Sequence, residues 1–183
     1  MGPAARGLTA PRRPRRIRAV TLKAAGFLRA ALLGLLLVLA LVSAARPADV
    51  YFSPRGGARL RLLQAIRDAR SSIDVAVYNF TAAELAEGLF QARDRGVRVR
   101  LVLDRERYEE GGATIQALRK SALSLRAWGV PGESLMHHKF AVFDGRLVAT
   151  GSYNWTNAAE RANRENLVIL RDPQVVQRFE REF

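Results

Sequence analysis

Hydrophobic and polar positions follow two alternating periods along residues 47–183, and this alternation predicts strands interleaved with helices. Apolar residues recur at helical spacing over residues 59–70, 81–95 and 113–120. Short runs rich in Val, Ile and Leu lie between these segments and predict strands. The predicted strands are residues 49–52, 73–80, 97–104, 123–128 and 165–170, with two more inside 135–154 and a last helix capped by Asp172-Pro173. This order is typical of an α/β fold, with one domain whose mixed β-sheet is flanked by helices on both faces.

Two local signals predict where particular elements begin or turn. Thr81 followed three positions later by Glu84 has the pattern of a capping box, so the second helix is expected to open there. Asp144-Gly145 favours a two-residue hairpin turn, because both residues tolerate positive φ. The segments on either side of this turn are therefore expected to pair as antiparallel strands.

The predicted hairpin carries both histidines of the chain, His137 and His138. Side chains alternate between faces along a strand, so His137 shares a face with Lys139 while His138 points to the other. A two-residue turn places His137 opposite Ser152, and a register shifted by one turn residue places it opposite Asn154. In either register the hairpin brings an imidazole, an ammonium, a hydroxyl and a carboxamide onto one patch.

This set of groups suits a phosphate diester. An ammonium together with hydroxyl and amide donors stabilises the charge that develops on the non-bridging oxygens in the transition state. The imidazole would serve as nucleophile or general acid. Asp144 lies five residues after Lys139 and faces away from the patch in an uninterrupted strand, so we interpret it first as a turn-forming residue.

The first 46 residues differ in composition from the rest of the chain. Residues 1–45 contain no acid, and eight Lys and Arg side chains precede an uncharged run at 30–45. A basic segment, an apolar stretch and small residues at its end describe an export signal, with cleavage after Ala44 or Ala45. Residues 24–29 would lengthen the run to the roughly 20 residues of a membrane span. We expect a cleaved signal or an uncleaved anchor, with a buried core helix as the third possibility.

Such a segment predicts an exported, extracytoplasmic protein, either membrane-anchored or secreted into a space such as the periplasm. It also accounts for most of the net charge. The whole chain carries +13, but from residue 46 onward 22 basic residues face 17 acidic ones, which leaves about +5. This mild excess supports nucleic-acid binding less strongly than the whole-chain value suggests.

Composition also narrows the chemistry. The chain contains no cysteine, which excludes disulfides and thiolate metal sites. With two histidines in total, a three-histidine zinc site cannot be built. We therefore expect a reaction that needs no metal and no cofactor.

The pattern His137-x-Lys139-x4-Asp144-x6-Gly151-Ser152-x-Asn154 resembles the HKD signature of the phospholipase D superfamily. The similarity extends to YFSPRGG at 51–57, VAVYNFTAAELAEGL at 75–89, RGVRVRLVLD at 95–104 and NRENLVIL at 163–170. It is strongest to the small single-motif branch, which contains exported bacterial Nuc-like endonucleases, the mitochondrial cardiolipin hydrolase and Zucchini-type ribonucleases. The resemblance implies a phospholipase D-like catalytic domain over residues 47–183. The zinc element of some Zucchini-type members has no counterpart here.

The resemblance also implies a mechanism. In this family one motif histidine attacks phosphorus to give a phosphohistidine, and the histidine of a second motif protonates the leaving oxygen and later activates water. This chain has one motif, so the resemblance implies a homodimer with a composite active site at a two-fold interface. The implied catalytic residues are His137, Lys139, Asp144 and Glu165, and the implied phosphate-binding residues are Lys139, Ser152 and Asn154. In relatives, the carboxylate that Glu165 matches orients the histidine.

Several other residues have ordinary interpretations. His138 is expected to pack or to form a hydrogen bond on the far face. Tyr153 and Trp155 alternate with the motif residues and are expected to lie in the core. Residues 125–135 form either a rim or lid over the site, with Trp128 reaching substrate, or a plain surface loop.

Taken together, the sequence predicts a metal-independent phosphodiesterase acting on phospholipid or on nucleic acid. The membrane segment favours phospholipid, whereas the Nuc-like length, the single motif and the mild positive charge favour nucleic acid. Transfer of a phosphatidyl group to an alcohol is an alternative reaction. A membrane-tethered binding protein without turnover is a further alternative, but it would be expected to have lost His137 or Lys139.

Overall fold

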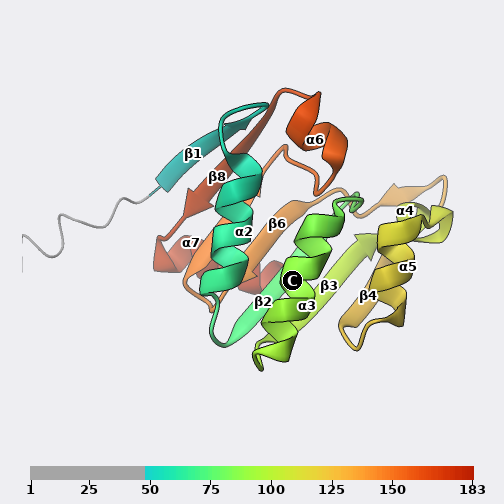
Figure 1. The fold of residues 1–183 in the computed structure, drawn as a ribbon, viewed down its shortest axis with the longest axis horizontal. Coiled ribbons are helices and arrows are strands. Elements are labelled where there is room, and N and C mark those ends of the chain that lie inside the picture. Colours follow the sequence, from blue (N-terminus) through green and yellow to red (C-terminus); the bar gives the residue numbers. More distant parts are fainter. Residues whose placement is uncertain (1–47) are drawn as a thin grey trace, which may run out of the picture. The chain divides into compact units, whose positions relative to one another are not determined.

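The computed structural model describes residues 48–183, so the predicted signal or anchor at residues 1–46 lies outside the described residues. The described chain contains one eight-stranded sheet in the order β1-β8-β7-β6-β2-β3-β4-β5 (Figure 1). The strands are β1 (Ala48–Ser53), β2 (Ser72–Val77), β3 (Arg98–Asp104), β4 (Ser124–Val130), β5 (Ser134–Leu135), β6 (Lys139–Phe143), β7 (Leu147–Gly151) and β8 (Glu165–Leu170). The helices are α2 (Ala58–Asp68), α3 (Ala83–Asp94), α4 (Arg105–Glu110), α5 (Ala113–Lys120), α6 (Asn157–Arg161) and α7 (Pro173–Glu182).

The sheet is mixed, as the sequence predicts. Strands β2, β3 and β4 run parallel, whereas β6, β7, β8 and β1 follow one another as antiparallel neighbours. The ends of β1, β2, β3 and β7 therefore meet the starts of β6 and β8 at one edge of the sheet. We call this edge the carboxyl edge, and every group discussed below is placed relative to it.

Helices cover both faces of the sheet, which confirms the predicted fold class (Figure 1). Helices α2 and α3 pack on one face over the larger core, where Leu62, Ile66 and Leu89 are fully buried. Helix α7 packs on the other face over a smaller core that includes Val142 and Val176. Because α7 is the one helix on that face within residues 48–183, part of the face remains open.

The hairpin register differs from both predicted registers. Asp144-Gly145 does form the turn, with φ of 53° and 61°, and the Arg146 N–H donates to the Phe143 carbonyl at 3.0 Å. The ladder, however, pairs Phe143 with Leu147. Arg146 and Leu147 thus both lie opposite Phe143, which is a β-bulge. The bulge shifts the second strand by one position. Neither predicted partner of His137 lies directly opposite it.

The predicted capping box does not form. Helix α3 has Ala82 as its N-cap and no side-chain capping bond. The N–H groups of Thr81 and Ala82 both donate to the Trp155 carbonyl at 2.9 Å, and this contact sets the path of the chain into the helix. Two short helices were missed, α4 and α6, each capped by the side chain of the preceding residue, Asp104 and Thr156. The predicted cap of the last helix, Asp172, is confirmed.

Candidate active site

His137 lies at the carboxyl edge, in the segment that leads into β6. Residues 136–138 belong to no strand, and two backbone bonds hold them. The Met136 N–H donates to the buried Asp104 carboxylate at 3.0 Å, and the Tyr78 N–H donates to the His138 carbonyl at 2.8 Å. The His137 side chain is therefore exposed on a backbone that is fixed on both sides.

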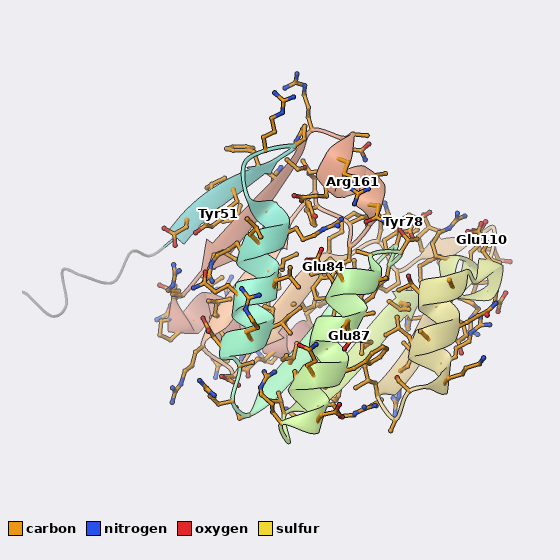
Figure 2. The ribbon with its side chains drawn as sticks, viewed as in Figure 1. Tyr51, Tyr78, Glu84, Glu87, Glu110 and Arg161 are labelled. Carbon is orange, nitrogen blue, oxygen red and sulfur yellow. The ribbon has the colours of Figure 1, made fainter. Side chains whose placement is uncertain are left out.

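Tyr78, the first residue after β2, collects the cationic and imidazole groups of the site. Its ring centroid lies 4.7 Å from that of His137, with 59° between the planes. The Nζ of Lys139 lies 5.0 Å from the same centroid, and the Cζ of Arg107 lies 5.7 Å from it. Figure 2 shows Tyr78 at the carboxyl edge. Because an aromatic face attracts cations, the ring favours this grouping of charges.

The sequence pattern did not indicate this role of Tyr78, nor the anchoring by Asp104. Asp104 is 1% exposed, and one of its oxygens caps α4 through the Arg107 N–H at 3.1 Å while the other holds Met136. The position of Asp104 at the end of an apolar strand could have indicated this anchoring role, because a buried carboxylate needs hydrogen-bond donors.

The two histidines diverge, as predicted from strand alternation. The Nε2 of His138 lies 3.1 Å from a carboxylate oxygen of Glu182 at the end of α7. Its ring also makes an edge contact with Phe140, at 5.4 Å between centroids. His138 thus connects the segment before β6 to α7, and within residues 48–183 His137 is the single imidazole beside Lys139.

Lys139 is partly buried, and its Nζ donates to the His137 carbonyl at 2.8 Å. Burial lowers the pKa of Lys139 below the usual value, and the negative charge of Glu165 opposes that effect. One of the three ammonium N–H donors is used by another group of residues 48–183, which leaves two for an anion in that part of the chain. An ammonium at this position can contact a phosphate that reaches His137.

Ser152 and Glu165 form a hydrogen-bonded unit next to Lys139. The Ser152 hydroxyl donates to one Glu165 oxygen at 2.5 Å, and the Asn163 amide donates to the other at 2.9 Å. The Asn166 N–H donates to the Ser152 oxygen at 3.1 Å. Within residues 48–183 Glu165 makes no hydrogen bond to His137, so the expected orientation of the histidine by Glu165 stays a prediction.

Gly151 is the last residue of β7, and Asn154 lies in the segment that follows it. The Asn154 Oδ1 is buried and has no hydrogen-bond donor within residues 48–183, so it is available as an acceptor. Gly151 has φ 142°, and a Cβ there would overlap the Asn166 carbonyl. Tyr153 and Trp155 are 1% and 2% exposed and lie in the core, as predicted.

Asp144 lies at the opposite edge of the sheet from the other motif residues. Its carboxylate accepts hydrogen bonds from the N–H groups of Arg70, Ser71 and Ser72 and from the Ser71 hydroxyl, at 2.7–3.1 Å. Burial alone would raise its pKa, but these hydrogen bonds outweigh burial and lower the pKa to about 2. The structure therefore does not bring Asp144 together with His137, and its contacts are those of a residue that ties the hairpin to the start of β2.

Residues 125–135 are neither a lid nor a plain loop. Most of them belong to β4 and β5. Trp128 is 57% exposed and, with Leu135 and Arg126, lines a groove of about 910 Å³ on the face of the sheet that α7 leaves open. The groove extends to His137. Trp128 is thus a rim residue of a groove that reaches the site.

Within residues 48–183, no three His, Asp or Glu side chains are grouped closely enough to hold a metal ion.

The sequence pattern of the family described as "Cardiolipin synthase, PLD-like domain" matches residues 62–183. The chain belongs to the phospholipase D superfamily. Human mitochondrial cardiolipin hydrolase is 41% identical over 131 residues, which cover 71% of this chain and 51% of that protein. A phospholipase D of Rickettsia conorii is 30% identical over 128 residues, which cover 70% of this chain and 63% of the relative.

Among solved structures, the phospholipase D family member Nuc from Salmonella typhimurium superposes with a TM-score of 0.67 at 36% identity. The match covers 74% of this chain and 90% of Nuc. The chain spans about half the length of the mitochondrial superfamily members that it matches. These findings confirm the predicted superfamily and its single-motif branch.

In the part of the chain that the structure describes, no helix combines the length and the apolar character needed to cross a bilayer.

Proposed function

We propose that this chain is a phospholipase D-type phosphodiesterase in which His137 is the nucleophile. The observation that carries the proposal is an exposed imidazole beside a partly buried lysine, with the hydroxyl of Ser152 and the open acceptor of Asn154 at the same edge. An imidazole beside an ammonium suits a phosphate diester, because the ammonium contacts the non-bridging oxygens while the imidazole attacks.

The reaction divides into two displacements at phosphorus. In the first, a His137 ring nitrogen forms a bond to phosphorus as the bond to the leaving alkoxide breaks, and the departing oxygen takes a proton from a second imidazole. In the second, that imidazole removes a proton from water, the hydroxide attacks phosphorus, and the phosphorus–nitrogen bond breaks. Lys139 stabilises the charge on the non-bridging oxygens in both steps.

The second imidazole is supplied by the partner subunit's His137 in a two-fold dimer. One imidazole cannot stand on both sides of an in-line displacement, and His138 is directed to Glu182. A two-fold axis through the site would present His137 and Lys139 twice. The proposed active protein is therefore a homodimer with one composite site.

The open face of the sheet supports a second copy as its partner. Trp128, Val130 and Leu135 are 57%, 48% and 48% exposed, and Val50 and Phe52 at the other end of the sheet are 53% and 58% exposed. The strand pairing connects Val50 to Phe140 across the sheet, so both side chains lie on the same face. On that face α7 covers Phe140 through Phe179. Because the groove beside Trp128 reaches His137, a copy packed there would lie next to the incomplete site.

Both phospholipid and nucleic acid remain substrates of this proposal, since the motif contacts the phosphate that they share. The relatives named for cardiolipin hydrolysis and phospholipase D activity favour lipid. Export and an N-terminal membrane anchor or signal are likewise part of the proposal, from residues 1–46. Transfer to an alcohol would use the same intermediate with another acceptor.

The test is cleavage by the full-length chain in detergent and EDTA. Its substrates are bis(4-nitrophenyl) phosphate, single- and double-stranded DNA, RNA, and mixed micelles of phosphatidylglycerol or cardiolipin. His137→Asn is the blank, and a phosphohistidine trapped by a denaturing alkaline quench is the expected intermediate. Turnover that survives His137→Asn would refute the mechanism, and absence of turnover on every substrate would favour the tethered binding protein.

A further inference from the structure

A second group of side chains lies at the carboxyl edge beside the proposed site. The loop after β1, the first turns of α2 and α3, and α6 surround an open hollow of about 530 Å³. The lining residues are Pro54, Arg55, Arg59, Leu60, Glu84, Glu160 and Arg161. Figure 2 shows Arg161 near the same edge as Tyr78. The hollow adjoins the site along the chain, because α6 begins three residues after Asn154 and Ser53 pairs with Glu165.

Three of the charged groups in the hollow satisfy one another. Arg59 is 7% exposed, donates to the Thr156 carbonyl at 3.0 Å and lies 3.6 Å from Glu84. Glu160 accepts from the Tyr153 hydroxyl at 2.7 Å and from the backbone N–H of Arg59 at 3.3 Å. Arg59 and the two acids therefore hold α2, α3 and α6 together, and one base against two acids leaves a charge of −1 among them.

The two remaining arginines of the hollow are unpaired. Arg55 and Arg161 are exposed, and neither has an ion pair or hydrogen bond from its side chain within residues 48–183. Arg164, which directly precedes Glu165, is also exposed and unpaired in that part of the chain. Arg55 has φ 73°, a conformation that a side chain other than glycine adopts at a cost and that is found at functional sites.

The opposite flank of the site differs. On α4, Arg107 pairs with Glu106 at 3.0 Å and with Glu110 at 2.7 Å. Arg105 donates to the carbonyls of β4 and lies 3.8 Å from Glu109. That flank has its arginines neutralised and more acids than bases in its helix. An extended polyanion centred on Lys139 is therefore attracted toward the α6 flank and not toward α4.

We propose that Arg55 and Arg161 bind phosphates of a nucleic-acid strand next to the scissile diester, with one nucleotide seated in the hollow. The inference rests on the proposed phosphodiesterase function and names its substrate class. A nucleic-acid strand carries further phosphates on either side of the bond that is cut. Unpaired arginines next to the site can bind these flanking phosphates. Pro54 and Leu60, the latter 68% exposed, provide apolar contact for a sugar or base.

The test compares two double variants of the full-length chain. Arg55→Gln with Arg161→Gln removes the proposed contacts. Arg70→Gln with Arg146→Gln is the matched control, because both are exposed arginines at the opposite edge. Each protein is assayed on a single-stranded oligonucleotide from 50 to 300 mM salt, on bis(4-nitrophenyl) phosphate, and on phosphatidylglycerol mixed micelles.

The expected result is a roughly 5- to 10-fold rise in KM for the oligonucleotide and a salt dependence of log(kcat/KM) shallower by about 1.4, at about 0.7 for each lost phosphate contact. Activity on the small diester should stay unchanged. An unchanged salt slope, or the same change in the control, would overturn the inference. A selective loss of activity on micelles in the Arg55 and Arg161 double variant would also overturn the inference. A wild-type protein that hydrolyses the small diester through His137 but cleaves no nucleic acid would overturn it as well, while the proposed phosphodiesterase chemistry would stand.

Discussion

Replacing Asp144 with Asn tests whether the aspartate of the HKD motif acts in chemistry or in folding. Its carboxylate accepts three backbone N–H groups of residues 70–72 and lies at the far end of β6 from Lys139. Five residues of strand separate the two, which is about 17 Å. Asn tolerates the positive φ of this position and has nearly the same size, so the substitution isolates the charge.

The structure gives the size of the expected loss. A pKa held at about 2, against 3.8 in an unfolded chain, corresponds to at most about 2.4 kcal/mol of stability at neutral pH. Asp144 is half-buried and its hydrogen bonds face solvent, so screening reduces this to about 1–1.5 kcal/mol. For a domain of this size we expect the Tm to fall by about 3–7 °C.

The assay is thermal unfolding of wild type and Asp144→Asn between pH 7 and pH 3, beside kcat on the small diester. Because the folded-state pKa is depressed, the stabilisation is full above about pH 4 and is lost as the pH falls toward 2. The Tm difference should therefore shrink as the pH falls through this window. We expect kcat at 25 °C to change by less than about twofold.

A loss of kcat by a hundredfold or more in Asp144→Asn with an unchanged Tm would refute this reasoning, since it would place the carboxylate in the reaction. A Tm difference that stays constant down to pH 3 would also contradict it, because the stabilisation would then not come from the ionised carboxylate.

Three further predictions concern the site itself. Co-expression of wild-type and His137→Asn chains in equal amounts should leave about one quarter of the activity per chain, because about one dimer in four keeps both imidazoles; one half remaining would indicate independent sites. Glu165→Gln should lower the pKa of Lys139 further, since Glu165 raises it, and so move the alkaline limb of the kcat/KM profile to lower pH; a limb that does not move would contradict the coupling. Tyr78→Leu should lower kcat/KM about tenfold through loss of the ring that gathers His137 and Lys139, and Tyr78→Phe should restore it; equal loss in both variants would assign the effect to the hydroxyl.

The sequence by itself determined the class of fold and most of the elements. The spacing of apolar residues in a helix or a strand is a local property of the sequence, because it depends on which side of that element faces the core. The divergence of His137 and His138 and the burial of Tyr153 and Trp155 followed from the same alternation, and the structure confirms them. The spacing of the motif was also enough to predict the superfamily, because that resemblance depends on residue types at fixed offsets along the chain.

Only the tertiary structure decided how the motif residues divide between the two edges of the sheet. The bulge at Arg146 moved the register away from both predictions, and hydrogen bonds from residues 70–72 hold Asp144 at the edge opposite to His137. The roles of Tyr78 and Asp104 arise from elements that meet across the sheet, β2 beside β6 and β3 beside the segment before β6. These roles arise from packing and hydrogen bonding between residues that are distant in the sequence. Such contacts produce no periodic pattern in the local sequence, so they could not be predicted from it.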